Sequence, residues 1–97
     1  MQTYEKLATS IPQIRNSKIN VTLWQFMPGE STGFHVHEHD YIVVPLVSGK
    51  LTAIHSDDST RIQVLEAGKS YFRQKGVEHN ILNSNSFDFS FVEIELL

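Results

Sequence analysis

Hydrophobic and polar residues alternate in short runs along most of the chain, and turn-forming residues separate one run from the next. Alternation with a period of two is typical of a strand that buries one face. The runs that predict strands are residues 19–27, 34–47, 50–55, 61–65, 71–73, 77–82 and 87–96. Only residues 1–10, which precede Pro12, could form a turn or two of helix. The pattern therefore predicts an all-β protein, built as an antiparallel sandwich or barrel.

Aromatic residues mark the expected core of this barrel. Phe87, Phe89 and Phe91 are spaced two apart near the end of the chain, so a strand would place them on one face. Trp24 and Phe26 have the same spacing in the first predicted strand. Large aromatic side chains are usually interior, so we predict core packing for both groups in preference to a ligand-binding role.

Size and composition narrow the function. The chain has 97 residues, no cysteine and a net charge of −3, which is compatible with one domain without disulfides or thiolate ligands. Its eight Lys and Arg residues are dispersed, so we expect no nucleic-acid partner. No apolar run is long enough to span a bilayer and the N-terminus does not resemble a signal peptide, which predicts a cytoplasmic protein without membrane contact. A chain of this size buries only roughly 60–65 % of its unfolded surface, which favours a homodimer.

Two segments carry the candidate chemistry. His35 and His37 lie two apart in a predicted strand and should project to one face, while His79 lies in a distant strand. Together they could form a facial metal-binding triad with open coordination positions. A single histidine in a strand is more often structural, so the metal hypothesis depends on all three meeting in space.

The spacing of glycines around these histidines resembles the two-part motif of the cupin superfamily. The positions that match are Gly29, His35, His37, Gly49, Gly68, Gly76, His79 and Asn83. Gln74 stands where the motif has a proline, and no glutamate follows the first histidine pair at the motif's spacing. The resemblance implies a cupin double-stranded β-helix, or jelly-roll barrel, forming a single domain over residues 1–97 with its core at about 19–96.

By the same resemblance, His35, His37 and His79 are the expected ligands of a divalent metal ion. Tyr41 and Ile42 occupy the place of the missing glutamate, and a tyrosine is a reluctant ligand because its pKa is about 10. We predict Tyr41 as a catalytic residue, acting as an acid or hydrogen-bond donor.

His39 has the same strand parity as the histidine pair and is the remaining candidate for a fourth ligand. It could instead support the ligands from outside the coordination shell or lie at the rim of the site. His55 stands beside Ser56 and Asp57 and is expected in an exposed hairpin.

Three neutral imidazoles leave the full double charge on the metal, which should attract a small anionic substrate. Three-histidine centres occur in the cupin superfamily among oxygenases, so the resemblance favours Fe²⁺, with Ni²⁺, Mn²⁺ and Zn²⁺ as alternatives. Arg61 and Arg73 could hold a substrate carboxylate, although either could equally be a solvated surface charge.

The leading hypothesis is thus a metal-dependent, dioxygenase-like enzyme. A non-catalytic metal- or ligand-binding module and a metal-dependent isomerase or lyase are the alternatives. The stretch at residues 37–46 also resembles small cupins associated with β-alanine degradation, which indicates a metabolic context without specifying a reaction.

Overall fold

The computed structural model describes residues 6–97, and its secondary structure consists of strands. In chain order the strands are β1 (Thr9–Arg15), β2 (Ile19–Phe26), β3 (His35–Val36), β4 (Asp40–Pro45), β5 (Gly49–Ile54), β6 (Thr60–Leu65), β7 (Tyr71–Arg73), β8 (Glu78–Asn83) and β9 (Phe89–Leu96). The prediction of an all-β protein is confirmed. Within this part of the chain there is no helix long and apolar enough to cross a membrane.

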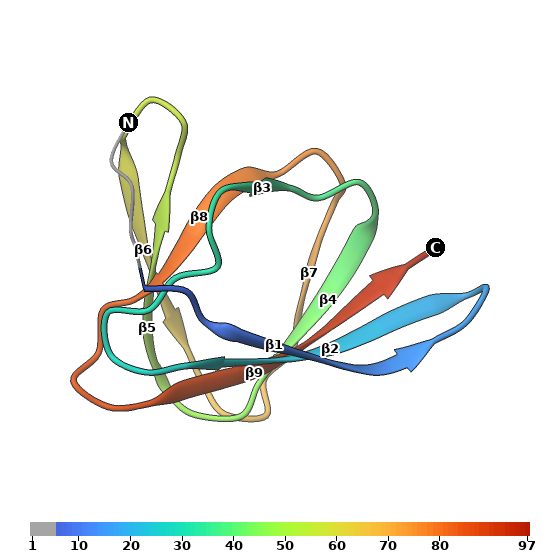
Figure 1. The fold of residues 1–97 in the computed structure, drawn as a ribbon, viewed down its shortest axis with the longest axis horizontal. Helices are drawn as coiled ribbons and strands as arrows, with labels where there is room; N and C mark the ends of the chain where they lie inside the picture. The colour runs from blue at the N-terminus through green and yellow to red at the C-terminus, as the bar shows by residue number, and fades with distance from the viewer. Residues whose placement is uncertain (1–5) are drawn as a thin grey trace.

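The strands form two antiparallel sheets that face each other (Figure 1). One sheet has the order β1-β2-β9-β4-β7 and the other has the order β3-β8-β5-β6. Neighbours in both sheets are distant in sequence, as in β2 with β9 and β3 with β8. This topology is what places His35 beside His79 although 43 residues separate them along the chain, since they pair directly in register.

The structure departs from the sequence prediction in two places. Residues 34–47 were expected as one strand, but the chain leaves the sheet at residues 37–39, so that β3 and β4 belong to different sheets. The turn or two of helix considered for residues 1–10 is wrong for residues 6–10, because Thr9 and Ser10 begin β1. Residues 1–5 lie outside the described part of the chain. β1 was missed because its residues are exposed along the whole strand and carry no alternating pattern.

The core lies between the two sheets, and its most deeply buried aromatic pair, Phe26 and Phe89, lies at one end of them. Phe26, Leu51 and Phe89 are each only 1 % exposed, and Phe91 packs with them. The aromatic prediction is confirmed for these phenylalanines, and Trp24 packs against the same cluster while remaining half-buried. It is wrong for Phe87, which is exposed because it precedes the start of β9.

The asparagine that ends the histidine motif closes this apolar end. The amide nitrogen of Asn83 donates to the carbonyl oxygens of Phe26 and Phe87, at 3.2 and 3.0 Å. Its amide oxygen accepts from the backbone and side-chain nitrogens of Asn85. Asn83 is therefore a structural residue that ties β2, β8 and the approach to β9 together.

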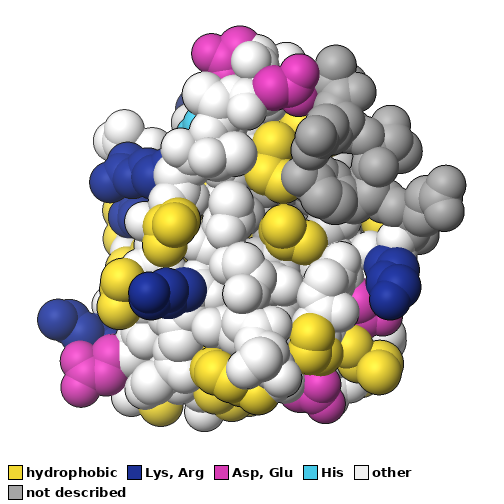
Figure 2. All heavy atoms as spheres, turned by 90° about the vertical axis from the view of Figure 1, so that its left-hand side faces the viewer, with side chains coloured by type: hydrophobic (Ala, Val, Ile, Leu, Met, Phe, Trp, Pro, Cys, Tyr) yellow, Lys and Arg dark blue, Asp and Glu magenta, His cyan; other side chains and the backbone are white. Residues whose placement is uncertain are grey.

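The outer surface is mixed in character. On the face that Figure 2 presents, hydrophobic side chains lie singly or in small groups among polar and charged atoms. Scattered apolar side chains of this kind are normal for a soluble domain surface and need no partner.

Candidate metal centre

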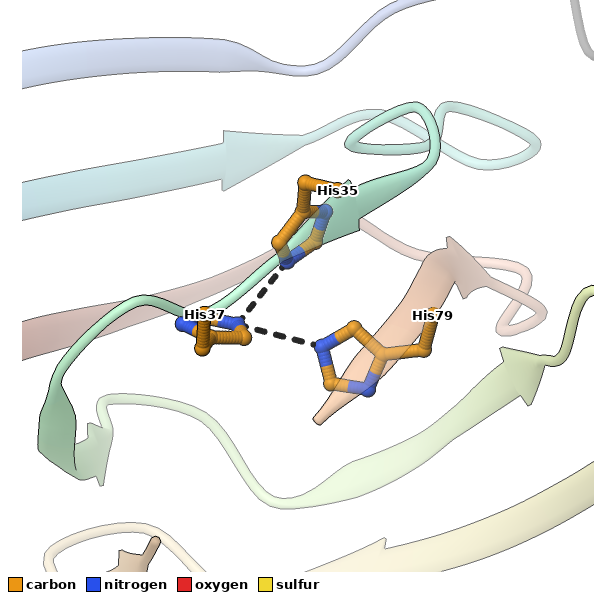
Figure 3. A group of neighbouring side chains, drawn as sticks. All are labelled: His35, His37 and His79. Atoms are coloured by element: carbon orange, nitrogen blue, oxygen red, sulfur yellow. Dashed lines mark hydrogen bonds between the residues drawn. The ribbon is translucent and has the colours of Figure 1, made fainter. Parts of the chain in front are cut away.

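The three histidines of the motif meet away from Phe26 and Phe89, and His79 lies at the opposite end of β8 from Asn83. His35 lies on β3, His37 directly follows that strand, and His79 lies on β8. Their rings point toward one another (Figure 3), with the Nε2 atom of His37 at 2.9 Å from that of His35 and 3.2 Å from that of His79. The structure thus brings together the three residues that the spacing singled out.

Backbone contacts hold His37 in place although it lies outside a strand. Its amide nitrogen donates to the carbonyl of Val77 at 2.9 Å, and its own carbonyl accepts from the amide of Gly76 at 2.8 Å. Gly76 has a φ of 96°, a conformation that L side chains rarely adopt. The motif glycine therefore shapes the turn that docks the His37 segment against the start of β8.

Hydrogen bonding fixes the tautomer of His35. Its Nδ1 atom lies 2.9 Å from the carbonyl oxygen of Gly33, an acceptor only, so Nδ1 must carry the proton. The lone pair is then on Nε2, which faces the other two rings. Metal-ligating histidines commonly donate their second nitrogen to a backbone carbonyl in this way.

Burial keeps the other two imidazoles neutral. It lowers the pKa of His37 to about 4, with a smaller contribution from the neighbouring His35. Burial also lowers the pKa of His79 to about 3, and the charges of His35 and His37 act in the same direction. Neutral imidazole is the form that binds a metal, so both side chains are in the ligand state at neutral pH.

The geometry fits a divalent ion. Imidazole nitrogens that bind zinc at about 2.0–2.1 Å lie roughly 3 Å apart when the ligand angles are between octahedral and tetrahedral. Two of the nitrogen pairs here, at 2.9 and 3.2 Å, have this separation. The ligand atoms of all three residues lie within 4.8 Å of one another, so a small rotation of a ring would complete the triad. The group can therefore hold a metal ion.

The triad opens onto an internal cavity of about 250 Å³. Its volume corresponds to about eight water molecules at ~30 Å³ each, which suits a small metabolite. Apart from the histidines, its walls are formed by Thr32, Tyr41, Val43, Leu51, Ala53, His55, Arg61, Gln63, Tyr71, Arg73, Val77, Ile81, Phe91 and Glu93.

Tyr41 lies at the base of the site. Its ring stacks on that of His37, with centroids 3.8 Å apart and planes inclined by 16°. Burial raises the pKa of Tyr41 above its usual value, and nearby Tyr71 and Glu93 act in the same direction. The phenol is therefore protonated at neutral pH and can serve as a hydrogen-bond donor but not as an anionic ligand.

The other two histidines differ from each other in placement. His39 is outside the three-histidine group and lines an adjoining outer groove, which His35 and His37 also border. His55, expected in an exposed hairpin, is half-buried and lines the cavity, because it continues the inward face of β5 set by Leu51 and Ala53.

The sequence interpretation did not identify Glu93, which lines the cavity. Phe89, Phe91 and Glu93 are two apart on β9, so the strand that buries the two aromatics also turns Glu93 inward. Burial raises the pKa of Glu93 to about 7, an effect that neighbouring Glu95 increases and Arg15 reduces. Extending the aromatic alternation by one more step would have found it.

The two candidate substrate arginines also lie at the cavity. Arg61 comes from β6 and Arg73 from β7, which are the edge strands of the two sheets on the same side of the fold. The guanidinium carbon of Arg73 lies 4.6 Å from the centroid of the Tyr71 ring, which holds that side chain against the wall. Both arginines line an adjoining outer groove as well, so they stand at the mouth of the cavity.

Fold and site together define a small jelly-roll protein with a three-histidine pocket, and the sequence model for the cupin domain matches residues 22–95. The chain belongs to the cupin family. It is 45 % identical over 84 residues to the beta-alanine degradation protein BauB of Pseudomonas aeruginosa, with 87 % of each chain covered.

Solved structures agree on the fold. A cupin domain from Bordetella pertussis Tohama I superposes with a TM-score of 0.91 at 40 % identity, covering 99 % of both chains. A cupin 2 conserved barrel domain protein from Salinispora arenicola gives a TM-score of 0.71 at 18 % identity, covering 98 % of this chain and 80 % of the other. The jelly-roll prediction is thereby confirmed.

Proposed function

We propose that this cupin is a metal-dependent enzyme that transforms a small anionic metabolite in the cavity at its three-histidine site. The observation that carries the proposal is the convergence of three Nε2 atoms on a cavity that also holds Tyr41, Glu93 and two arginines. A purely structural cluster would not need an adjoining space lined by acids, bases and cations.

A bound divalent ion would supply Lewis acidity and a site for an anionic group of the substrate. The residues of the chain do the rest. His35, His37 and His79 hold the ion without cancelling its charge, Tyr41 supports the His37 ring and can donate a hydrogen bond, and the apolar walls exclude water. Arg61 and Arg73 attract and orient an anion at the mouth.

Two considerations support a dioxygenase-like reaction with iron. Three-histidine centres without a glutamate are a feature of oxygenases in this superfamily, and the missing carboxylate leaves room for more than one exogenous ligand. The similarity to a protein named for beta-alanine degradation supports a role in the breakdown of a small amino acid or its products. Mn²⁺, Ni²⁺ or Zn²⁺ would fit the same nitrogen ligands, and an isomerase or lyase would use them in the same way.

A non-catalytic binding module is the second candidate, and the burial of Tyr41 favours it. A phenol that is only 3 % exposed and stacked on a ligand is well placed to stabilise the site but poorly placed to reach a substrate. In that case the protein would hold its ligand without changing it.

We also propose that the protein forms a homodimer through β1. This strand is the edge of the five-stranded sheet, all seven of its residues are exposed, and it presents Ile11 and Ile14 to solvent. A long exposed edge strand readily pairs with another chain. Light scattering should give twice the chain mass, and Ile14→Lys should shift it to the monomer; a monomeric wild type would refute the dimer.

The enzymatic proposal is tested by loading metal-free protein with Fe²⁺ under nitrogen and then adding oxygen with a panel of small carboxylates and amino acids. Oxygen uptake that depends on a panel member and is lost in His37→Gln, but kept in the matched control His39→Gln, would support the enzyme. Stoichiometric metal binding with ligand retention but no product from any compound would establish the binding module instead.

A further inference from the structure

Glu93 has an environment that a carboxylate normally avoids. It projects from the middle of the five-stranded sheet into the cavity, between Thr22 on β2 and Val43 on β4, neither of which carries a charge. Within residues 6–97 its carboxylate forms no hydrogen bond or ion pair. Its pKa of about 7 reflects this desolvation.

The nearest cation does not pair with Glu93. The positive charge of Arg15 lowers the pKa of Glu93, which offsets part of the rise caused by burial. The guanidinium of Arg15, however, forms its hydrogen bonds with other groups. It donates to the carbonyl oxygens of Ile14 and Val21 and to the hydroxyl of Thr22, at 2.9–3.0 Å. Glu93 is half-buried, and a carboxylate that is partly removed from water without a cationic partner is destabilising. Its position in a ligand-sized cavity indicates that the partner comes with the ligand.

Two arginines give the far side of the cavity from Glu93 a positive charge. Arg73 lies on β7, which is separated from β9 by β4, so the two backbones are about 10 Å apart at ~4.8 Å per strand spacing. Arg61 lies on the facing sheet at the same mouth. The cavity therefore has an acidic side at Glu93 and a basic side at the arginines, and its volume of about 250 Å³ suits a small molecule that carries both charges.

We propose that the ligand is a short amino acid, with its amine bound by Glu93 and its carboxylate bound by the metal and the arginine pair. This inference specifies the substrate class of the proposed function and rests on it for the metal. An ammonium group supplies the hydrogen-bond donors and the positive charge that the Glu93 carboxylate lacks. A carboxylate suits both a dication and guanidinium groups.

The test is calorimetric titration of Zn²⁺-loaded protein with ω-amino acids of two to five carbons and with the carboxylic acids of equal chain length. We expect at least one amino acid to bind about tenfold or more tightly than its matched acid. Glu93→Gln should remove most of that preference while leaving binding of the plain acid within about threefold. Asp88→Asn, an exposed acid just before β9 that lies outside the cavity lining, is the control and should keep the preference.

The outcomes separate this inference from the proposed function. If zinc binds stoichiometrically but the amine gives no advantage, or the advantage survives Glu93→Gln, the inference is overturned and the metal site stands. If neither series binds, it is likewise overturned. If zinc does not bind to the wild type, the proposed function itself has failed. Should Glu93→Gln not fold, Glu93→Asp serves instead and should weaken the preference because the shorter acid withdraws from the ligand.

Discussion

The two ends of this barrel are built from the same strands and have opposite properties. On β9, Phe89 fills the closed end, Phe91 lies between that end and the cavity, and the next inward residue, Glu93, enters the cavity. On β8, Asn83 braces the closed end through four hydrogen bonds while His79 faces the other two histidines. One half of each strand therefore supplies packing, and the other half holds polar groups that packing alone would not select.

The open end carries groups whose ionisation is opposed by burial. Burial lowers the pKa values of His37 and His79, which keeps both rings neutral even in mild acid, and raises that of Glu93 to about 7, which leaves this carboxyl partly protonated at neutral pH. Such arrangements lower stability and are tolerated at functional sites. The closed end, with its ring contacts and satisfied amide, supplies the compensating stability.

The largest change in the free energy of unfolding should come from a substitution at the closed end. Phe89→Ala removes a ring that is 1 % exposed and should lower the free energy of unfolding by about 3–5 kcal/mol, because it leaves a cavity among packed side chains. Chemical denaturation of the metal-free protein measures it. A loss below about 1 kcal/mol would mean that this end is not the main source of stability.

A smaller loss of stability is expected when Asn83, whose side-chain amide braces the same end, is replaced. Asn83→Ala should destabilise by about 2 kcal/mol, since the carbonyl oxygens of Phe26 and Phe87 lose a donor. Metal stoichiometry of the folded variant should not change. Ser86→Ala, at a nearby exposed position, is the control and should be near neutral.

At the open end a substitution should raise the free energy of unfolding instead of lowering it. The folded-state pKa of Glu93, about 7, lies above its ordinary value of 4.5, so folding opposes its ionisation. The resulting loss of stability is absent below pH 4.5, grows as the pH rises and is complete above 7. Glu93→Gln should therefore stabilise the metal-free protein by about 2 kcal/mol at pH 8 and have little effect at pH 4. Unfolding curves at both pH values decide this, and destabilisation at pH 8 would contradict it.

The smallest effect should follow removal of one hydroxyl group. Tyr41→Phe keeps the ring that stacks on His37, so metal affinity should stay within about twofold. Tyr41→Leu removes the stacking and should weaken metal binding more. If turnover is found and Tyr41→Phe lowers it about 100-fold or more without changing metal affinity, the phenol acts in the reaction, as its sequence position predicts.

The sequence was most informative where chemistry depends on spacing. The placement of His35, His37 and His79 within the glycine framework was enough to predict that they meet, because strand parity and the motif turns fix their directions. His55 and Glu93 were not recognised, although both continue an inward alternation on strands that were themselves predicted. Neither residue belongs to a recognised motif. A polar or charged residue at the end of an apolar strand face is most simply predicted to be exposed to solvent.

Other features required the tertiary structure. After β3 the backbone of His37 donates a hydrogen bond to the carbonyl of Val77 and accepts one from the amide of Gly76, and no local pattern of residues 34–47 encodes these long-range contacts. Because the strand is interrupted after β3, parity could not be extended from His37 to His39, and His39 lies outside the three-histidine group. β1 was missed for a related reason, since an exposed edge strand carries no hydrophobic alternation.

The central claim is that the polar end of the barrel is a metal centre made by three histidines, and metal titration of the chelator-stripped protein tests it most directly. The wild type should bind one divalent ion per chain. Replacing His35, His37 or His79 singly with Gln should lower affinity more than the ~100-fold typical of losing an outer-shell partner, whereas His39→Gln and His55→Gln should change it far less. Full affinity retained in all three triad variants, or no binding by the wild type, would contradict the account.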